Sequence, residues 1–213
     1  MMSDLMRHRR LMHTRRVTCE GYLRDDGLYE IESVLIDNKH HIVHVGDRGA
    51  IATDESFHEL RVLLLIDAQL IVHDIVAQTV HAPYSQCGEI SSAYGALKGL
   101  NLGHEFMKQA RQLLGGVAGC THINELLTPA VTTAIQTVWH VRDRLTVPQA
   151  ERPPLLPNAP CPPEVGQCYA LRPESDAVRR YYPYFYIKPA TPAGSVAETA
   201  APTGSSPELS LIH

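Results

Sequence analysis

The sequence predicts an α+β protein, in which an antiparallel sheet of two hairpins is followed by helices that pack on one face of the sheet. Two observations support this fold class. The first half of the chain holds runs of alternating apolar and polar residues separated by turn signals, and the second half holds apolar residues at helical spacing. Strands that come first and helices that come second are typical of the α+β class.

The predicted strands form two hairpins. The first pairs Val17–Leu23 with Leu28–Ile36 around Asp-Asp-Gly, residue types that accept the positive φ of tight turns. The run His40–Val45 is expected to continue this meander. The second hairpin pairs Glu59–Ile66 with Leu70–Val80.

The predicted helices follow the second hairpin. Two short ones are expected over Ser91–Leu97 and Glu105–Leu114, each bounded by glycine. Apolar residues then recur at helical spacing from Ile123 to Val138, which predicts a long helix. Pro129 lies inside this pattern, so the helix is expected to kink or restart there.

Proline usage divides the chain. All but two of the 15 prolines, Pro83 and Pro129, lie from Pro148 onward. We therefore predict an α+β core over residues 1–147 and a proline-rich wrap over 148–189. The aromatic segment Tyr181–Tyr186 of this wrap is expected to dock on the core, either as packing or as a pocket lining. Residues 190–213 have the composition of a disordered tail.

The composition of the chain limits the classes of binding partner and the cellular compartment that we expect. A net charge of −4 gives no general reason to expect nucleic acid, and the longest apolar run, Val62–Ile66, is too short to cross a membrane. The five cysteines are odd in number and have no CxxC spacing, which indicates free thiols and a cytoplasmic location. The arginines of RHRRLMHTRR are expected in a solvated arm or a first strand, with an anion contact as the alternative.

Two thiols and two imidazoles are candidates for one metal site. Cys120 and His122 lie at the predicted start of the long helix, where the positive end of the helix dipole favours a thiolate. Cys87 follows the second hairpin and His58 precedes it, so the hairpin brings these two residues to one edge of the sheet. A buried structural role for each residue taken alone stays the alternative.

Four stretches resemble the bacterial DUF2889 family over about residues 9–145: CEGYLRDDGLYEIE, SFHELRVLLLID, APYSQC and GCTHINEL. The hairpin, the loop cysteine and the cysteine before the long helix are more distantly similar to the NifU-like iron–sulfur scaffold domain. This resemblance implies a NifU-like fold with zinc or a cluster bound at Cys87 and Cys120. His58 falls where that domain has its first cysteine, and His122 follows Cys120 instead of preceding it. These departures favour a single ion over a labile cluster.

The sequence-based hypothesis is a metal-dependent enzyme that acts on a small hydroxylated, and in one version aromatic, organic molecule. A divalent ion, zinc first and iron as the alternative, would be held by His58, Cys87, Cys120 and His122. Lyase-type C–C or C–O cleavage is favoured over hydrolysis. Two alternative functions stay open: a metal or iron–sulfur carrier, and a structural or partner-binding domain without chemistry. Self-association of the chain also stays open. The expected catalytic helpers are Tyr84, Glu125 and Arg24.

Overall fold

The computed structural model describes residues 9–103, 105–142, 158, 160–162 and 164–189. The chain divides into two compact units, Met1–Arg152 and Pro153–His213, and each is described here by itself. The predicted core boundary near residue 147 and the predicted tail over residues 190–213 lie outside the described residues.

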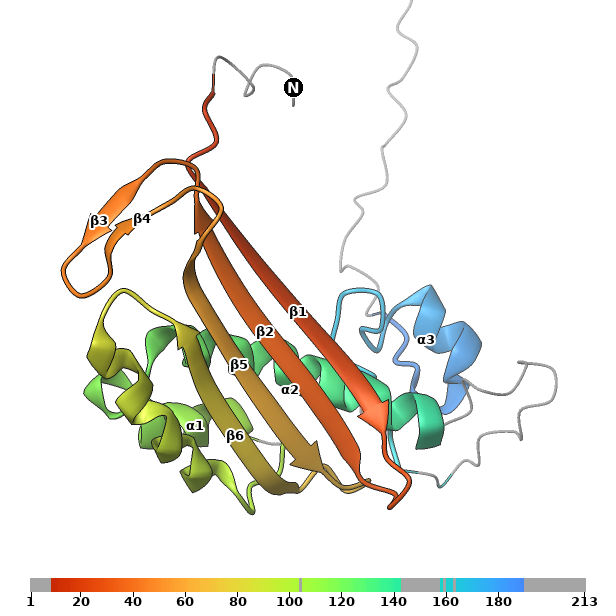
Figure 1. Ribbon diagram of the computed structural model, residues 1–213. Coiled ribbons are helices and arrows are strands. Elements are labelled where there is room, and N and C mark those ends of the chain that lie inside the picture. The colour runs from red at the N-terminus through yellow and green to blue at the C-terminus, as the bar shows by residue number, and fades with distance from the viewer. Residues whose placement is uncertain (1–8, 104, 143–157, 159, 163, 190–213) are drawn as a thin grey trace, which may run out of the picture. The chain divides into compact units, whose positions relative to one another are not determined.

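The main sheet of the first unit has four antiparallel strands, which confirms the predicted fold class (Figure 1). Their order across the sheet is β1 (His13–Leu23), β2 (Tyr29–Lys39), β5 (Ser56–Ile66) and β6 (Val72–His81). Residues His40–Val45 do not continue the meander, because β3 (Val43–Val45) pairs with β4 (Gly49–Ile51) in a separate small sheet.

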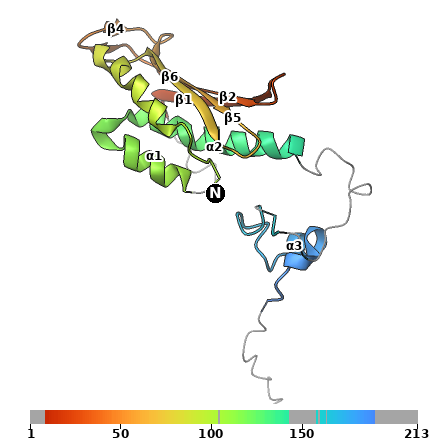
Figure 2. The same cartoon turned by 90° about the horizontal axis from the view of Figure 1, so that it is seen from below.

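The helices of the first unit lie on one face of the main sheet (Figure 2). In chain order they are η2 (Ser85–Leu97), α1 (Phe106–Leu114), η3 (Gly116–Ala118) and α2 (Thr121–Arg142). The first of these is a 3-10 helix that begins earlier than expected. Pro129 neither ends nor restarts α2, which continues through it as one helix.

The core lies between the sheet and these helices. Alternate residues of β2 and β5 are buried, and Ile31, Leu35 and Leu64 have 1% exposure or less. From the other side, α2 contributes apolar side chains that are also fully buried, among them Ile123 and Leu126. Each such side chain contributes roughly 1.5–3 kcal/mol when it leaves water, so this layer supplies most of the stability of the first unit.

A glycine allows α2 to lie close to the edge strand. A Cβ atom added to Gly21 of β1 would overlap the side chain of Thr137 on α2. Thr137 itself donates a hydrogen bond of 2.8 Å from its hydroxyl to the carbonyl of Thr133. The absence of a side chain at position 21 therefore sets how closely the helix crosses the strand.

The second unit contains the short helix α3 (Asp176–Tyr181) and the 3-10 turn η6 (Pro183–Phe185). Ser175 caps α3, because its hydroxyl accepts a hydrogen bond from the backbone N–H of Val178. The aromatic segment Tyr181–Tyr186 forms the end of α3 and the turn that follows it. Its docking on the first unit stays a prediction.

Candidate functional site

Three side chains lie in one row across the main sheet, at the end where β1 begins. Arg15 of β1 is directly opposite Asp37 of β2, and Asp37 is directly opposite His58 of β5. Residues opposite each other in antiparallel strands project from the same face, which here is the inner face. The start of α2 adds His122, whose ring centroid lies 3.9 Å from that of His58.

We call Asp37, His58 and His122 the head cluster. Each of the three offers one possible metal-ligand atom, and these atoms all lie within 4.8 Å of one another. Asp37 is 1% exposed and His58 is 9% exposed, whereas His122 is half-buried. The cluster therefore runs from the protein interior towards solvent.

Asp37 accepts hydrogen bonds on both of its carboxylate oxygens. Arg15 donates from Nε to Oδ1 at 2.8 Å and from Nη2 to Oδ2 at 2.7 Å. Oδ2 also lies 2.9 Å from Nδ1 of His58, and Oδ1 lies 3.2 Å from Nε2 of His13. Burial alone would raise the pKa of Asp37, but the hydrogen bonds from Arg15 and His58 and the charge of Arg15 outweigh burial and lower it. Asp37 is thus ionised at neutral pH.

The ionised Asp37 fixes the tautomer of His58. Burial lowers the pKa of His58, and the neighbouring His122 lowers it further, so the imidazole is neutral at pH 7. A carboxylate only accepts hydrogen bonds, and the proton of the neutral ring must therefore sit on Nδ1. The lone pair of Nε2 is then available to bind a metal ion or to take up a proton.

Arg15 connects the head cluster to the surface of α2. Besides its two bonds to Asp37, its guanidinium forms an ion pair with the carboxylate of Glu125. The Glu125 side chain is 49% exposed and that of Arg15 is 33% exposed. The two carboxylates and the one guanidinium together carry a net charge of −1, which favours a bound cation.

The start of α2 is held in place by a buried phenol. Tyr94 of η2 is fully buried, and its oxygen accepts a hydrogen bond of 3.0 Å from the backbone N–H of Cys120. The same hydroxyl donates to Oδ1 of Asn124 at 2.8 Å, and burial raises the pKa of Tyr94 to about 12. Asn124 in turn donates to the carbonyl of Leu114. These bonds position the helical turn that carries His122.

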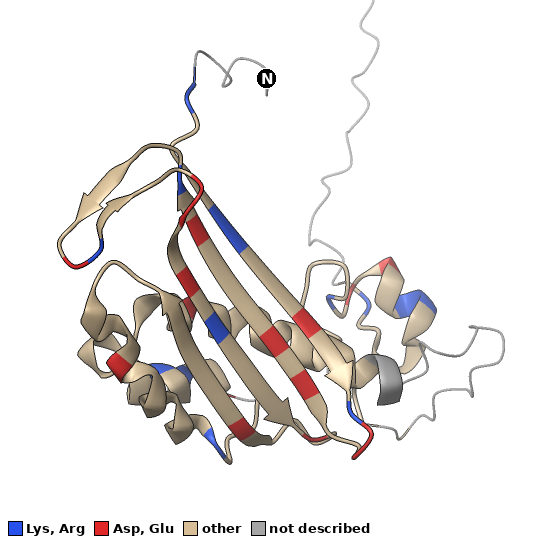
Figure 3. Cartoon of the chain, viewed as in Figure 1, with Lys and Arg blue, Asp and Glu red and all other residues tan. Residues whose placement is uncertain are grey.

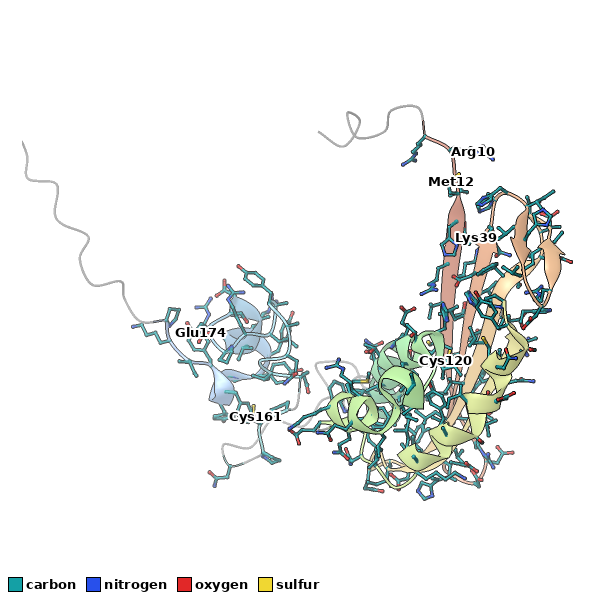
Figure 4. All side chains as sticks on the ribbon, turned by 90° about the vertical axis from the view of Figure 1, so that its left-hand side faces the viewer. Arg10, Met12, Lys39, Cys120, Cys161 and Glu174 are labelled. Carbon is teal, nitrogen blue, oxygen red and sulfur yellow. The ribbon has the colours of Figure 1, made fainter. Side chains whose placement is uncertain are left out.

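The structure unites some of the residues predicted from the sequence. His58 and His122 belong to the head cluster, and Glu125 reaches it through Arg15. Cys120 immediately precedes α2, as expected, and packs against the apolar core (Figure 4). In the part of the chain that the structure describes, the one three-residue group of possible metal ligands contains Asp37 and no cysteine.

The other predicted residues are not members of the head cluster. Cys87 lies in η2, and its carbonyl accepts a hydrogen bond from Thr79 near the end of β6. Tyr84 precedes η2 and is 59% exposed. Arg24 follows the far end of β1, where it pairs with Asp26 and Glu30, about 30 Å from Arg15 along the strand.

Sequence reasoning missed Asp37 and His13, whereas it placed Arg15 among the arginines of a solvated arm or first strand, with an anion contact as the alternative. The predicted strand ended at Ile36, because Asp37-Asn38-Lys39 has the composition of a turn. Alternation carried one step further would have placed Asp37 on the inner face with Ile31 and Leu35. A carboxylate at an inward position was the signal that could have identified the site.

The geometry defines an α+β protein with a carboxylate–histidine cluster at one end of its sheet. A family model described as "Protein of unknown function (DUF2889)" matches residues 13–136, and the chain belongs to that family. No curated protein and no solved structure is found to match the chain. The similarity to the NifU-like scaffold domain therefore stays a prediction. Across the described residues, none of the helices combines the length and the apolar character needed to cross a bilayer.

Proposed function

We propose that the head cluster binds a divalent metal ion and that the protein is a metal-dependent enzyme acting on a small hydroxylated organic molecule. The observation that supports this proposal is the convergence of Asp37, His58 and His122 within 4.8 Å. We propose a cytoplasmic location for the protein, because its five cysteines are free thiols.

The ligand types suit zinc or iron. Imidazole nitrogens bind both metals, and two histidines with one carboxylate leave coordination positions for water or substrate. An ion at such an open position would lower the pKa of a substrate hydroxyl group. In the lyase-type reaction that we favour over hydrolysis, the oxygen of that hydroxyl would form a carbonyl double bond while the neighbouring C–C or C–O bond breaks. The electron pair of the broken bond would leave on oxygen, or on a carbon next to a carbonyl group, and that atom would then take up the proton. Aromatic substrates are one subclass of this proposal.

Arg15 competes with a metal ion for Asp37. All the hydrogen bonds that Asp37 accepts from Arg15 and His58 use the oxygens that an ion would need. In a metal-bound state, Asp37 either gives up Arg15 or remains the partner that orients His58, an arrangement that is common around zinc-binding histidines. A guanidinium released from Asp37 would be free to bind a carboxylate of the substrate.

The experiment that tests metal binding is calorimetric titration of zinc and of iron(II) into chelator-treated protein. We expect one site in the parent chain and a loss of more than about 100-fold in affinity in His58→Gln and His122→Gln, because changes next to a ligand already cost roughly 10–100-fold. His73→Gln is the matched control, since His73 also lies 2.8 Å from a carboxylate, that of Asp67. Equal affinities in all three variants, or no binding by the parent chain, would refute the proposal.

A second set of variants tests whether the cysteines contribute to metal binding. Cys87→Ser and Cys120→Ser are compared with Cys161→Ser in the second unit. A loss of metal in the first two variants alone would add thiolates to the site, as the sequence predicted. A brown protein that contains sulfide would favour the carrier function over the enzyme.

A second candidate function follows from the contacts of Asp37. The hydrogen bond between Asp37 and His58 leaves Nε2 of His58 as a general base, and this arrangement needs no metal ion. Its support is the paired hydrogen bonding of Arg15 to Asp37, which satisfies the carboxylate without an ion. Thermal-shift screening of hydroxylated aromatic and acyl compounds, with and without chelator, separates the two candidates. Ligand binding that survives the chelator and is lost in His58→Gln favours the general base.

A further inference from the structure

The two edges of the main sheet differ in how their backbone groups are used. At the β6 edge, Val72 donates a hydrogen bond to the carbonyl of Leu100 and accepts one from the N–H of Gly99. At the other edge, β1 is 11 residues long. Within the described part of the first unit, β2 is the one strand that pairs with it. Long open edge strands are templates for pairing with another chain.

The hydrogen bonds between β1 and β2 show which backbone groups of β1 point towards β2, and the remaining groups point outward. The carbonyl of Met12 accepts a hydrogen bond from His40, and the N–H of Arg24 donates one to Leu28, so these residues point towards β2. The direction alternates along an antiparallel strand. The outward N–H and C=O groups are therefore those of the odd-numbered residues, His13, Arg15, Val17, Cys19, Gly21 and Leu23.

We infer that β1 pairs with β1 of a second copy of this chain, antiparallel and with the twofold axis at Thr18. This register places Val17 opposite Cys19 of the second copy and Arg15 opposite Gly21 of the second copy. Both are pairs of outward-facing, odd-numbered residues, so all the open backbone groups of the paired segment find partners. Thr18 lies opposite itself, and threonine pairs are favourable across strands.

Charge selects this register over its neighbours. With the axis at Thr18, Arg16 lies opposite Glu20 of the second copy, and the symmetry forms this ion pair twice. An axis at Val17 would place Arg16 opposite Thr18, and an axis at Cys19 would place it opposite Tyr22. Within one chain Arg16 and Glu20 are about 13 Å apart along the strand and do not meet. Figure 3 shows the basic beginning and the acidic later part of β1.

The exposure of apolar side chains on β1 supports the same partner. Val17 is 43% exposed, although its opposite neighbour on β2, Leu35, is fully buried. Leu23 is 53% exposed. A second copy of β1 at this edge covers Val17 with the side chain of Cys19 and extends the inner face of the sheet beyond β1.

The test combines charge exchange with crosslinking in the full-length chain. Analytical ultracentrifugation should detect a dimer, which Arg16→Glu and Glu20→Arg should each weaken by at least about tenfold, since each creates two like-charge contacts. The double variant Arg16→Glu/Glu20→Arg should restore the dimer. Thr18→Cys should form a disulfide-linked dimer on oxidation, because directly opposite Cα atoms about 4.5 Å apart suit a disulfide.

Thr14→Cys is the matched control for crosslinking, on the same strand and the same face. In the inferred register two residues 14 lie about 27 Å apart, too far for a disulfide. Both cysteine variants carry Cys19→Ser, so that the native thiol of β1 does not contribute. A chain that stays monomeric at about 100 μM overturns the inference. So does a dimer that tolerates both single charge reversals, or one that crosslinks equally through residues 14 and 18.

Discussion

The inner face of the main sheet has two regions that share the same strands but are built from different chemistry. In the first region, which we call the body, Ile31, Leu35 and Leu64 pack with apolar residues of α2. The second region, which we call the head, lies one step further along β2. There the side chain that continues the row is Asp37, and ion pairs and imidazoles replace the apolar packing. The body needs only to exclude water, whereas the head must satisfy every polar atom that it buries. The same secondary structure thus serves stability at one end and chemistry at the other.

The largest effect is expected from a cavity in the body. Leu64→Ala should lower the free energy of unfolding by about 2–5 kcal/mol, because Leu64 is 1% exposed and its neighbours cannot fill the space. Urea denaturation measures the change, with Leu113→Ala on the exposed side of α1 as the control. Metal affinity of the folded variant should match that of the parent chain. A large loss of affinity would show that the body and the head are not separable.

Removing the charge of Asp37 should have the next largest effect. Asp37→Asn leaves Arg15 without its counter-ion, at a cost of about 2–3 kcal/mol for hydrogen bonds to a charged group. The pKa of Asp37 is lowered in the folded protein, so its contribution is present above the ordinary value of 3.8 and is lost as the pH falls through the lowered value. Urea denaturation at pH 7 and at pH 3 should therefore show a smaller loss on acidification in Asp37→Asn. An equal loss in both proteins would assign the acid sensitivity to other carboxylates.

A smaller effect is expected where the body supports the head. Tyr94→Phe removes the hydroxyl that serves Cys120 and Asn124, and it should cost about 1–2 kcal/mol because buried polar groups lose their partner. Metal affinity should also fall, since the turn carrying His122 loses its support. Tyr84→Phe, an exposed tyrosine, is the control for both measurements. Unchanged affinity in Tyr94→Phe would mean that the packing of α2 alone positions His122.

The smallest effect is a pH dependence at the head. The pKa of His58 is lowered in the folded protein, so the folded state disfavours the protonated ring. Stability is complete above the ordinary value of 6.5 and declines as the pH falls from there through the lowered value. The loss between pH 7.5 and pH 5.5, measured by urea denaturation, should be smaller in His58→Gln than in the parent chain. A larger loss in His58→Gln than in the parent chain would contradict the assignment.

The sequence predicted the body better than the head, for a physical reason. Alternation and helical spacing are local signals, and they located β1, β2, β5, β6 and α2 to within a few residues. The head depends on which residues face one another across strands. Because the predicted strand ended at Ile36, one residue too early, Asp37 was not assigned to the inner face of the sheet. The proximity of His58 and His122 could be predicted, because the hairpin and the start of the helix restrict where these two residues lie. Cys87 and Cys120 were predicted as metal ligands from the order of motifs along the chain, and that order contains no information on the distances between side chains.

Arg15 gives the molecule a connection that neither region has alone. Its side chain lies in the head, on Asp37, while its backbone N–H and C=O groups lie at the open edge of β1. An ion that displaces the guanidinium therefore acts on the strand through which a second copy is proposed to bind. Coupling between two equilibria is reciprocal. Metal affinity should then vary with protein concentration, and the dimer constant should shift by the same factor when the metal is bound.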